Sequence, residues 1–276
     1  MQLKIDVVDA FTDVLFKGNS AAVIIVDDWL PVATMQAIGS ENNLSETAFV
    51  KPLPSGKYAI RWFSPLSEIP FCGHATLASA FVLFRDQPQV NELIFCADAV
   101  GELTVTKQDD GYIQMSFPNR CPKPVDDIPE QLIKGLSIKP TNVLVSKQAW
   151  FAVYDNEQQV LDVEQNTALL AELGPLDVVV TGPNMQKGTQ TDSQTQEQYD
   201  FASRYFWPAN GGFEDPVTGS IHAGLAPYWA DRLGKNELIA FQASKRGGIL
   251  RCKIVDDRVV ISGKGVGYLQ GVINLG

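Results

Sequence analysis

The sequence has few of the residues that build metal centres and disulfide frameworks. Its 276 residues include only 4 cysteines and 2 histidines. The cysteines have no CxxC spacing, and neither histidine belongs to an HExxH pattern, so neither a disulfide framework nor a zinc site is indicated. We expect no dedicated metal centre and reduced, mostly buried thiols at Cys72, Cys96, Cys121 and Cys252.

Basic residues are also scarce, with 22 Lys and Arg against 32 Asp and Glu, which gives a net charge of −10. Because no Lys/Arg cluster stands out, we expect neither a nucleic-acid partner nor an anionic membrane surface. No apolar run reaches membrane-spanning length, and residues 1–30 lack the basic and apolar regions of a secretory signal. We therefore expect a cytoplasmic protein.

What the sequence does contain is one motif in two versions. Glu68 to Ala75 reads EIPFCGHA, and Glu214 to Ile221 reads EDPVTGSI, with Glu, Pro and Gly identical. The copies begin 146 residues apart, about half the chain, which indicates a duplicated unit rather than a solenoid of short repeats. Apolar runs follow both copies, at Ala75 to Phe84 and Ala223 to Trp229, and predict helices surrounded by protein.

Each copy of the motif therefore predicts a turn that leads into a buried helix. The glycine lets backbone amides come close to a ligand, and the first N–H groups of a helix have no partner within the helix. Each turn is a candidate anion site for this reason. Two such ends facing one another would suit a small molecule that carries a carboxylate.

The rest of the pattern predicts many short strands, among them 58–63 and 92–97, a helix that starts at Pro31 and stops at Gly39, and one apolar helix in each half. A sheet that curls around one helix buries it completely, so we predict an α+β fold of two pseudo-symmetric lobes, each a barrel-like, mostly antiparallel sheet around a central buried helix. The segment 118–129 is rich in proline and polar residues and resembles a linker. We predict lobes at 1–118 and 119–264, with the C-terminal strand 265–276 joining the N-terminal lobe.

Residues 184–200 are dominated by Gln, Thr, Asp and Gly and lack apolar periodicity. This composition is typical of a surface loop, and a decorative insertion is the simpler interpretation. A lid over the cleft is the alternative.

Several segments together resemble the PhzF family of phenazine-biosynthesis-like proteins. They cover essentially the whole chain in the family's order and comprise Phe16 to Val23, Leu44 to Phe49, Phe71 to Thr76, Tyr199 to Phe206, Glu214 to Ser220 and Gln242 to Leu250. The resemblance implies the diaminopimelate-epimerase fold, with the active site between two lobes, and a homodimer. The family's characterised phenazine enzyme isomerises trans-2,3-dihydro-3-hydroxyanthranilate without a metal or organic cofactor, so no cofactor is expected here.

The same resemblance identifies Glu46 as the general acid/base. A hydrogen shift needs a group that takes a proton from carbon and returns it elsewhere, and one carboxylate can do both. His74 follows Gly73 at a predicted helix start, where the helix dipole favours a neutral ring that can contact substrate or pass a proton. Taken without the resemblance, Glu46 would more simply be an exposed strand end and His74 a packed or capping residue.

The second copy supplies the matching residues of the other lobe. Asp215, the third predicted catalytic residue, would accept a hydrogen bond from an amino or hydroxyl group of the substrate, while Ser220 and the Gly219 amide would bind a carboxylate. Asp and Ser are also common helix caps, and we predict a dual role. His222, one turn position away from the site, is predicted to be structural.

Three further residues complete the predicted substrate-binding set. Gly73 presents its backbone, Ser45 stands beside Glu46 in the same family segment, and Asn19 belongs to another segment, although a role in its turn is the simpler interpretation.

Two other functions remain open. Epimerases and racemases of this fold use two cysteines, but Cys72 is matched by Thr218 in the second copy, which argues against that chemistry. A protein that binds a metabolite without catalysis is the third possibility. We predict a cofactor-independent isomerase of a small cyclic or unsaturated amino or hydroxy acid.

Overall fold

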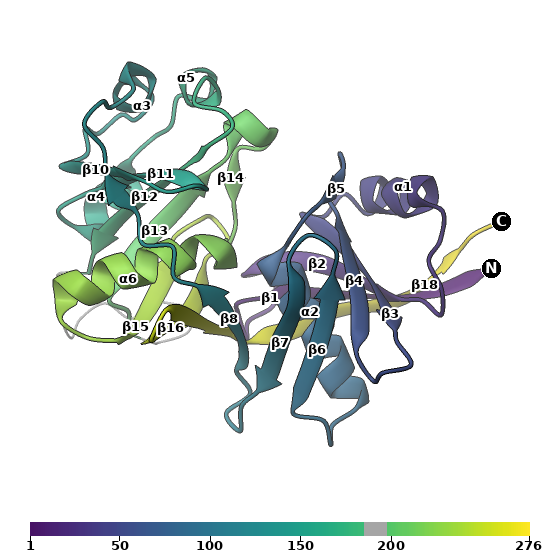
Figure 1. The fold of residues 1–276 in the computed structure, drawn as a ribbon. Coiled ribbons are helices and arrows are strands. Elements are labelled where there is room, and N and C mark those ends of the chain that lie inside the picture. Colours follow the sequence, from purple (N-terminus) through teal and green to yellow (C-terminus); the bar gives the residue numbers. More distant parts are fainter. Residues whose placement is uncertain (185–197) are drawn as a thin grey trace. The chain divides into compact units, whose positions relative to one another are not determined.

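The computed structural model of the chain describes residues 1–184 and 198–276. These residues form two compact units, one of Met1–Ser116 with Ser262–Gly276 and one of Phe117–Ile261 (Figure 1). The divisions lie two and three residues from the predicted lobe boundaries. Most of the predicted loop 184–200 lies outside the described residues. The alternative prediction, a lid over the cleft, falls on the same residues.

The first unit is a sheet that encloses one long helix. Its elements are β1 (Gln2–Ala10), β2 (Asn19–Ile25), α1 (Val32–Asn42), β3 (Glu46–Pro52), β4 (Tyr58–Phe63), β5 (Glu68–Ile69), α2 (Gly73–Asp86), β6 (Glu92–Ala97), β7 (Gly101–Lys107), β8 (Ile113–Pro118) and β18 (Gly265–Asn274).

The second unit has the same plan with more short helices. Its elements are β9 (Lys123–Pro124), α3 (Glu130–Lys134), β10 (Asn142–Val145), β11 (Ala149–Val153), α4 (Glu157–Asp162), α5 (Thr167–Ala171), β12 (Asp177–Pro183), β13 (Phe201–Phe206), η1 (Pro208–Asn210), β14 (Glu214–Asp215), η2 (Gly219–Ile221), α6 (His222–Leu233), β15 (Glu237–Gln242), β16 (Gly248–Val255) and β17 (Arg258–Gly263).

Strand pairing shows the duplication that the motif predicted. In the first unit β2 pairs in parallel with β3, β3 is antiparallel to β4, and β4 is antiparallel to β5 and parallel to β6. In the second unit β11, β12, β13, β14 and β15 repeat these four pairings in the same order. Antiparallel pairs, as predicted, are formed by β1 with β18 and β2, by β10 with β9 and β11, by β15 with β16, and by β7 with β6 and β8.

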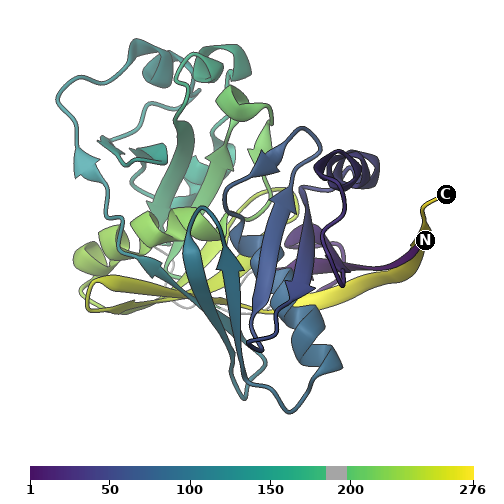
Figure 2. The same cartoon turned by 45° about the vertical axis from the view of Figure 1, so that its right-hand side comes forward.

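Both central helices are buried, as their all-round apolar sequences predicted. In α2 every residue from Gly73 to Ala80 is buried, and in α6 every residue from His222 to Ala230 is buried. Figure 2 shows α2 behind the strands of its unit. The second helix enters through the 3₁₀ turn η2 rather than directly, a difference from the first copy.

Pro227 inside α6 illustrates how the core tolerates a helix breaker. Proline has no N–H and leaves the carbonyl four residues earlier, that of Ala223, without its helical donor. The backbone N–H of Arg120 donates to this carbonyl at 2.9 Å. The segment after β8 therefore supplies the hydrogen-bond donor that this helix carbonyl lacks.

Most predicted elements match the structure, but some short ones were missed. The strands expected at 58–63 and 92–97 are β4 and β6. The helix expected to stop at Gly39 continues to Asn42, where Asn43 adopts the left-handed conformation and ends it. The short helices α3 and α4 and the strand β13 were not predicted. Among the described residues, no helix is both long and apolar enough to span a membrane.

Candidate active site

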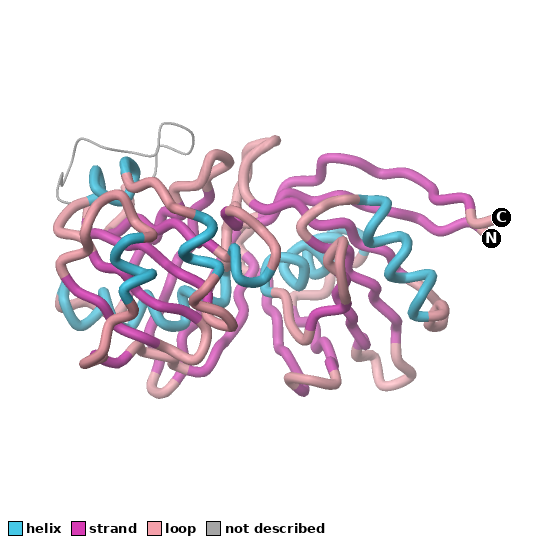
Figure 3. Tube along the Cα trace, turned by 90° about the horizontal axis from the view of Figure 1, so that it is seen from above, coloured by secondary structure: helices cyan, strands magenta, loops and turns pink. Residues whose placement is uncertain are grey.

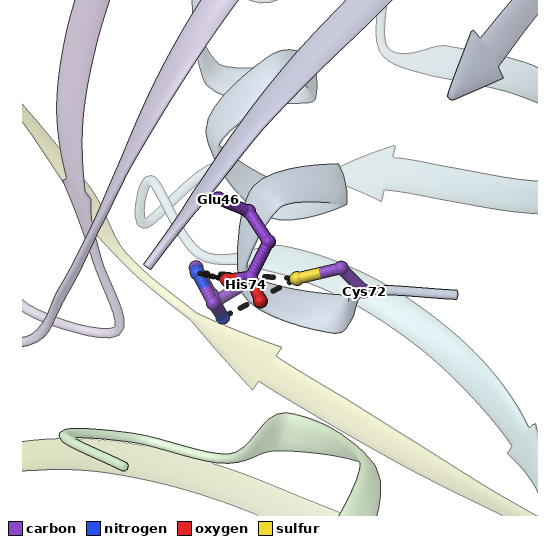
Figure 4. A group of neighbouring side chains, drawn as sticks. All are labelled: Glu46, Cys72 and His74. Atoms are coloured by element: carbon purple, nitrogen blue, oxygen red, sulfur yellow. Dashed lines mark hydrogen bonds and ion pairs between the residues drawn. The ribbon is translucent and has the colours of Figure 1, made fainter. Parts of the chain in front are cut away.

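In the first unit, three predicted residues converge with a fourth side chain. Nε2 of His74 lies 2.8 Å from Oε2 of Glu46, an ion-pair contact whose direction departs from that of a hydrogen bond. Nδ2 of Asn19 lies 3.1 Å from Nδ1 of the same ring. The Cys72 sulfur lies 3.4 Å from Nδ1, so carboxylate, imidazole and thiol point toward one another (Figure 4).

Local structure explains why these residues meet. Glu46 begins β3 and is the register partner of Ala21 in β2, the strand that Asn19 begins. His74 is the second residue of α2, which is packed against β2 and β3. The start of a buried helix is thus placed beside the starts of two parallel strands. Asn19 is fully buried, and its side chain contacts His74.

The protonation of His74 differs from the sequence prediction. Burial lowers the pKa of the ring, but the neighbouring Cys72 and Glu46 outweigh burial and raise the pKa well above its ordinary value. Burial, followed by the Glu46 charge, raises the pKa of Cys72 to about 11, so the sulfur is a thiol near neutral pH. The expectation of a neutral imidazole is wrong, because the neighbouring Cys72 and Glu46 raise the pKa of the ring in spite of its burial.

A charged ring also gives Asn19 a defined task. Both nitrogens of an imidazolium donate, so Nδ1 needs an acceptor. When the Asn19 amide group flips, its Oδ1 can accept a hydrogen bond from Nδ1 of the charged ring. In the orientation shown, Nδ2 can donate to Nδ1 of the neutral ring. Asn19 can therefore follow either protonation state of His74.

Glu46, Cys72 and His74 also form a group of donor types that zinc uses, with ligand atoms within 4.8 Å of one another. The separation of 2.8 Å between Nε2 and Oε2 is shorter than the spacing of about 3.3 Å between nitrogen and oxygen ligands on a tetrahedral ion with bonds of about 2 Å. The two groups are spaced for contact with each other rather than for a shared metal.

In the second unit, Asp215 ends β14, and a buried glutamine stabilises the turn that follows. Thr218 donates its hydroxyl to Oδ2 of Asp215. Gln242, which is fully buried, accepts from the Thr218 backbone N–H at 2.8 Å and donates to the Asp215 carbonyl at 2.9 Å. The position that matches Cys72 thus holds a hydroxyl that hydrogen-bonds the candidate carboxylate.

Ser220 has a different partner from the helix cap that its residue type suggested. Its hydroxyl oxygen accepts from Nε2 of Gln148 at 2.9 Å. No side-chain cap hydrogen bond is made by Thr218 at the start of η2. The cap role predicted for Ser220 is therefore not supported by its described contact, whereas the hydroxyl proton remains available for another acceptor.

The remaining predicted residues take simpler places. Gly73 is the first residue of α2, Gly219 begins η2, and Ser45 lies half-buried just before β3. His222 is fully buried and donates from Nδ1 to the Thr218 carbonyl at 2.9 Å, which confirms the structural role predicted for it.

Sequence reasoning assigned no role to Gln148, Gln242 or Tyr205, which support the second turn. Tyr205 and Gln242 lie in segments that carried the family resemblance, so a signal was present for them. For Gln148 no motif marked the position.

Comparison with known proteins shows which family the chain belongs to. The family model described as phenazine biosynthesis-like protein, PhzC-PhzF, matches residues 8–271. The chain belongs to the PhzF family.

A PhzF relative named uncharacterized isomerase, from Halalkalibacterium halodurans, is 42% identical over 276 residues and is covered completely by this chain. The crystal structure of a PhzF family protein from Enterococcus faecalis has 39% identity and a TM-score of 0.90, with both chains covered completely. A probable proline racemase from Agrobacterium radiobacter has 12% identity and a TM-score of 0.58, covering 99% of this chain and 93% of its own, and shares the fold. The predicted α+β architecture of epimerase type is confirmed.

Proposed function

We propose that this chain is an isomerase that moves a hydrogen within a small cyclic or unsaturated amino or hydroxy acid, with Glu46 as the general acid/base. The observation that supports it is the contact of the Glu46 carboxylate, whose side chain is 13% exposed, with His74 at 2.8 Å. Relatives named isomerases, 41–42% identical over full length, support the reaction class.

The proposed reaction needs one proton and no redox partner. The Glu46 carboxylate removes a proton from a carbon of the substrate, and the electron pair left behind shifts along the unsaturated system. The resulting carboxylic acid returns the proton to a second carbon, which restores the carboxylate. His74 orients Glu46 through their ion-pair contact, and Cys72 fills the space beside the ring.

Asp215, Gly219 and Ser220 are proposed to bind the polar groups of the substrate. The Thr218 hydroxyl on one oxygen of Asp215 orients this carboxylate as an acceptor for an amino or hydroxyl group. Ser220 and the Gly219 amide would donate to a carboxylate. Gly73, Ser45 and Asn19 stay predicted substrate-binding residues, and Asn19 also contacts His74.

Proton NMR in deuterated water tests this proposal with trans-2,3-dihydro-3-hydroxyanthranilate and a panel of small amino and hydroxy acids. Wild type should convert the dihydroaromatic acid with deuterium entering the ring, and Glu46→Gln should lose at least about a thousandfold in rate. The matched control is Glu92→Gln, an exposed residue at the start of β6, which should keep full activity. Activity retained by Glu46→Gln would remove Glu46 from its role.

Two other outcomes would replace the proposed function with a different one. Deuterium exchange confined to the alpha position of an amino acid would indicate an epimerase or racemase. Binding without any exchange, unchanged in Glu46→Gln, would indicate a metabolite-binding protein. The homodimer implied by the family stays a prediction, and light scattering after size-exclusion chromatography tests it.

A further inference from the structure

A directional chain of hydrogen bonds in the second unit ends on Ser220. The Asp177 carboxylate accepts from the Tyr205 hydroxyl at 2.7 Å and, on its other oxygen, from Nδ2 of Asn210 at 2.8 Å. The amide nitrogen of Gln148 donates to the Tyr205 oxygen at 3.2 Å and to the Ser220 oxygen at 2.9 Å. The backbone N–H of Asp177 donates to the backbone carbonyl of Gln148 at 3.2 Å, so these two residues are also joined directly.

The carboxylate sets the direction of every bond in this chain. An ionised aspartate can only accept, so Tyr205 has to donate its single proton to Asp177. Burial raises the pKa of Asp177, while the hydrogen bonds from Tyr205 and Asn210 oppose this shift, so the direction holds at a pH well above the usual range of aspartate. Burial, followed by the charge of Asp177, raises the pKa of the Tyr205 hydroxyl and keeps it protonated. The phenol oxygen is then left as an acceptor, and only the amide nitrogen of Gln148 can serve it.

The orientation of the Gln148 amide decides what Ser220 can do. With Nε2 directed to Tyr205 and Ser220, the Ser220 oxygen receives a proton and its own proton has to point elsewhere. With Oε1 in that place, Ser220 would donate to Gln148 and have only lone pairs to offer a ligand. A serine hydroxyl rotates freely, so without such a partner it could act in either sense.

We propose that Gln148 is a positioning residue that fixes the Ser220 hydroxyl as a donor and so selects substrates that present a carboxylate there. This inference rests on the proposed function, because it takes Ser220 as a substrate-binding residue. It adds residues to which sequence reasoning assigned no role: Gln148 acts through Ser220, while Tyr205 and Asp177 act through Gln148.

Hydrogen positions can be observed directly by neutron diffraction of the exchanged wild-type protein at pH 8, well above the ordinary pKa range of aspartate. We expect deuterium on the Tyr205 oxygen directed at Asp177, two deuterons on the Gln148 atom nearest Ser220, and the Ser220 deuteron turned away from Gln148. A Ser220 deuteron directed at Gln148 would overturn the inference, whatever the protein catalyses.

Kinetics test the consequence for the substrate. Gln148→Glu keeps the shape but can only accept, so the Ser220 proton is drawn to residue 148. We expect KM for the dihydroaromatic acid to rise about tenfold or more, with kcat changed less than about threefold. Tyr205→Phe should raise KM less, because Gln148 loses its direction but not its donors.

The matched control is Tyr154→Phe, which removes a buried hydroxyl of the same unit that donates to the Ile138 carbonyl at 2.7 Å. It should leave KM unchanged. Gln148→Leu serves as a second variant if Gln148→Glu unfolds at a lower temperature, and it should raise KM as well.

The outcomes separate this inference from the proposed function. Wild-type turnover with an unchanged KM in both Gln148 variants overturns the inference and leaves the isomerase intact. No turnover of any acid by wild type contradicts the proposed function, and the neutron positions then decide the state of Ser220 alone.

Discussion

His74 and His222 stand at the starts of the two central helices, yet their surroundings shift their pKa values in opposite directions. The ring of His74 touches the Glu46 carboxylate, and its pKa is raised well above the ordinary value, whereas burial lowers the pKa of His222 to about 4 although its hydrogen bond to Thr218 opposes the shift. NMR titration of the chain's two histidines should show one ring titrating on each side of pH 6.5. In Glu46→Gln, the pKa of His74 should fall, because one of the two neighbours that raise it loses its charge while burial remains.

The lowered pKa of His222 also predicts how the protein loses stability in acid. Its folded pKa lies below the unfolded value of 6.5, so the stability it contributes is present above pH 6.5 and is lost as pH falls through about 4. The loss should be about 3 kcal/mol, at 1.36 kcal/mol for each unit. Urea unfolding of wild type and His222→Gln at pH 7 and pH 4.5 measures it, and an equal pH dependence in both proteins would contradict the prediction.

Cys72 is the residue that a cysteine-dependent epimerase mechanism would need as a base, but its environment opposes that use. Its thiol is 6% exposed, and its pKa is raised to about 11. Cys72→Ala should therefore keep turnover within about tenfold of wild type. Iodoacetamide at pH 7.5 should label the exposed Cys121 first. Loss of all activity in Cys72→Ala, together with fast labelling of Cys72, would favour the epimerase mechanism.

At the scale of elements, the turn from β1 to β2 places Asn19 against His74 and depends on Gly18. Gly18 has a φ of +62°, and a Cβ there would lie 2.1 Å from the Ala10 carbonyl oxygen. Gly56, between β3 and β4, has a φ of +80° but no atom within 4 Å of its Cβ position, so it isolates the cost of the backbone conformation. Gly56→Ala should cost about 1 kcal/mol in the free energy of unfolding, and Gly18→Ala more than about 3 kcal/mol. Equal costs in urea unfolding would show that the close approach does not matter.

The central helices and long strands could be predicted because their signals are local. An apolar run such as Ala75 to Phe84 specifies burial by itself, and alternating β-branched residues specify a strand. The missed helices α3 and α4 have five and six residues, too few for a helical period to stand out. The site was predicted where a motif marks it, as for Glu46 and His74.

The missed contacts of the site are those between residues far apart in the chain. Asn19 is 55 residues from His74, and Gln148 is 72 residues from Ser220. Such pairs are set by how helices and turns pack against the sheet, which periodicity does not provide. The charge of His74 was predicted wrongly for a related reason: Glu46, one of the two neighbours that raise its pKa, comes from a different element.

At the scale of the whole molecule, the first unit is built from two separate parts of the chain. β18 pairs antiparallel with β1 from Gln2 opposite Asn274 to Ala10 opposite Gly265, and the two ends lie side by side (Figure 3). The Met1 amino group donates to the Leu275 carbonyl at 2.7 Å. The last strand therefore covers one edge of β1, whose other edge pairs with β2.

This arrangement predicts that residues 1–116 cannot form the first unit alone. Without β18, the hydrogen-bonding groups along one edge of β1 are exposed, and an uncovered strand edge favours aggregation. A fusion that places residues 262–276 before Met1 through a short Gly/Ser linker restores the pairing, because positions 1 and 275 are already in contact. We expect the fusion to be monomeric with a cooperative thermal transition, and residues 1–116 alone to aggregate or lack one. Circular dichroism and light scattering of the two proteins measure the difference, and a cooperative transition in residues 1–116 alone would show that β18 is dispensable.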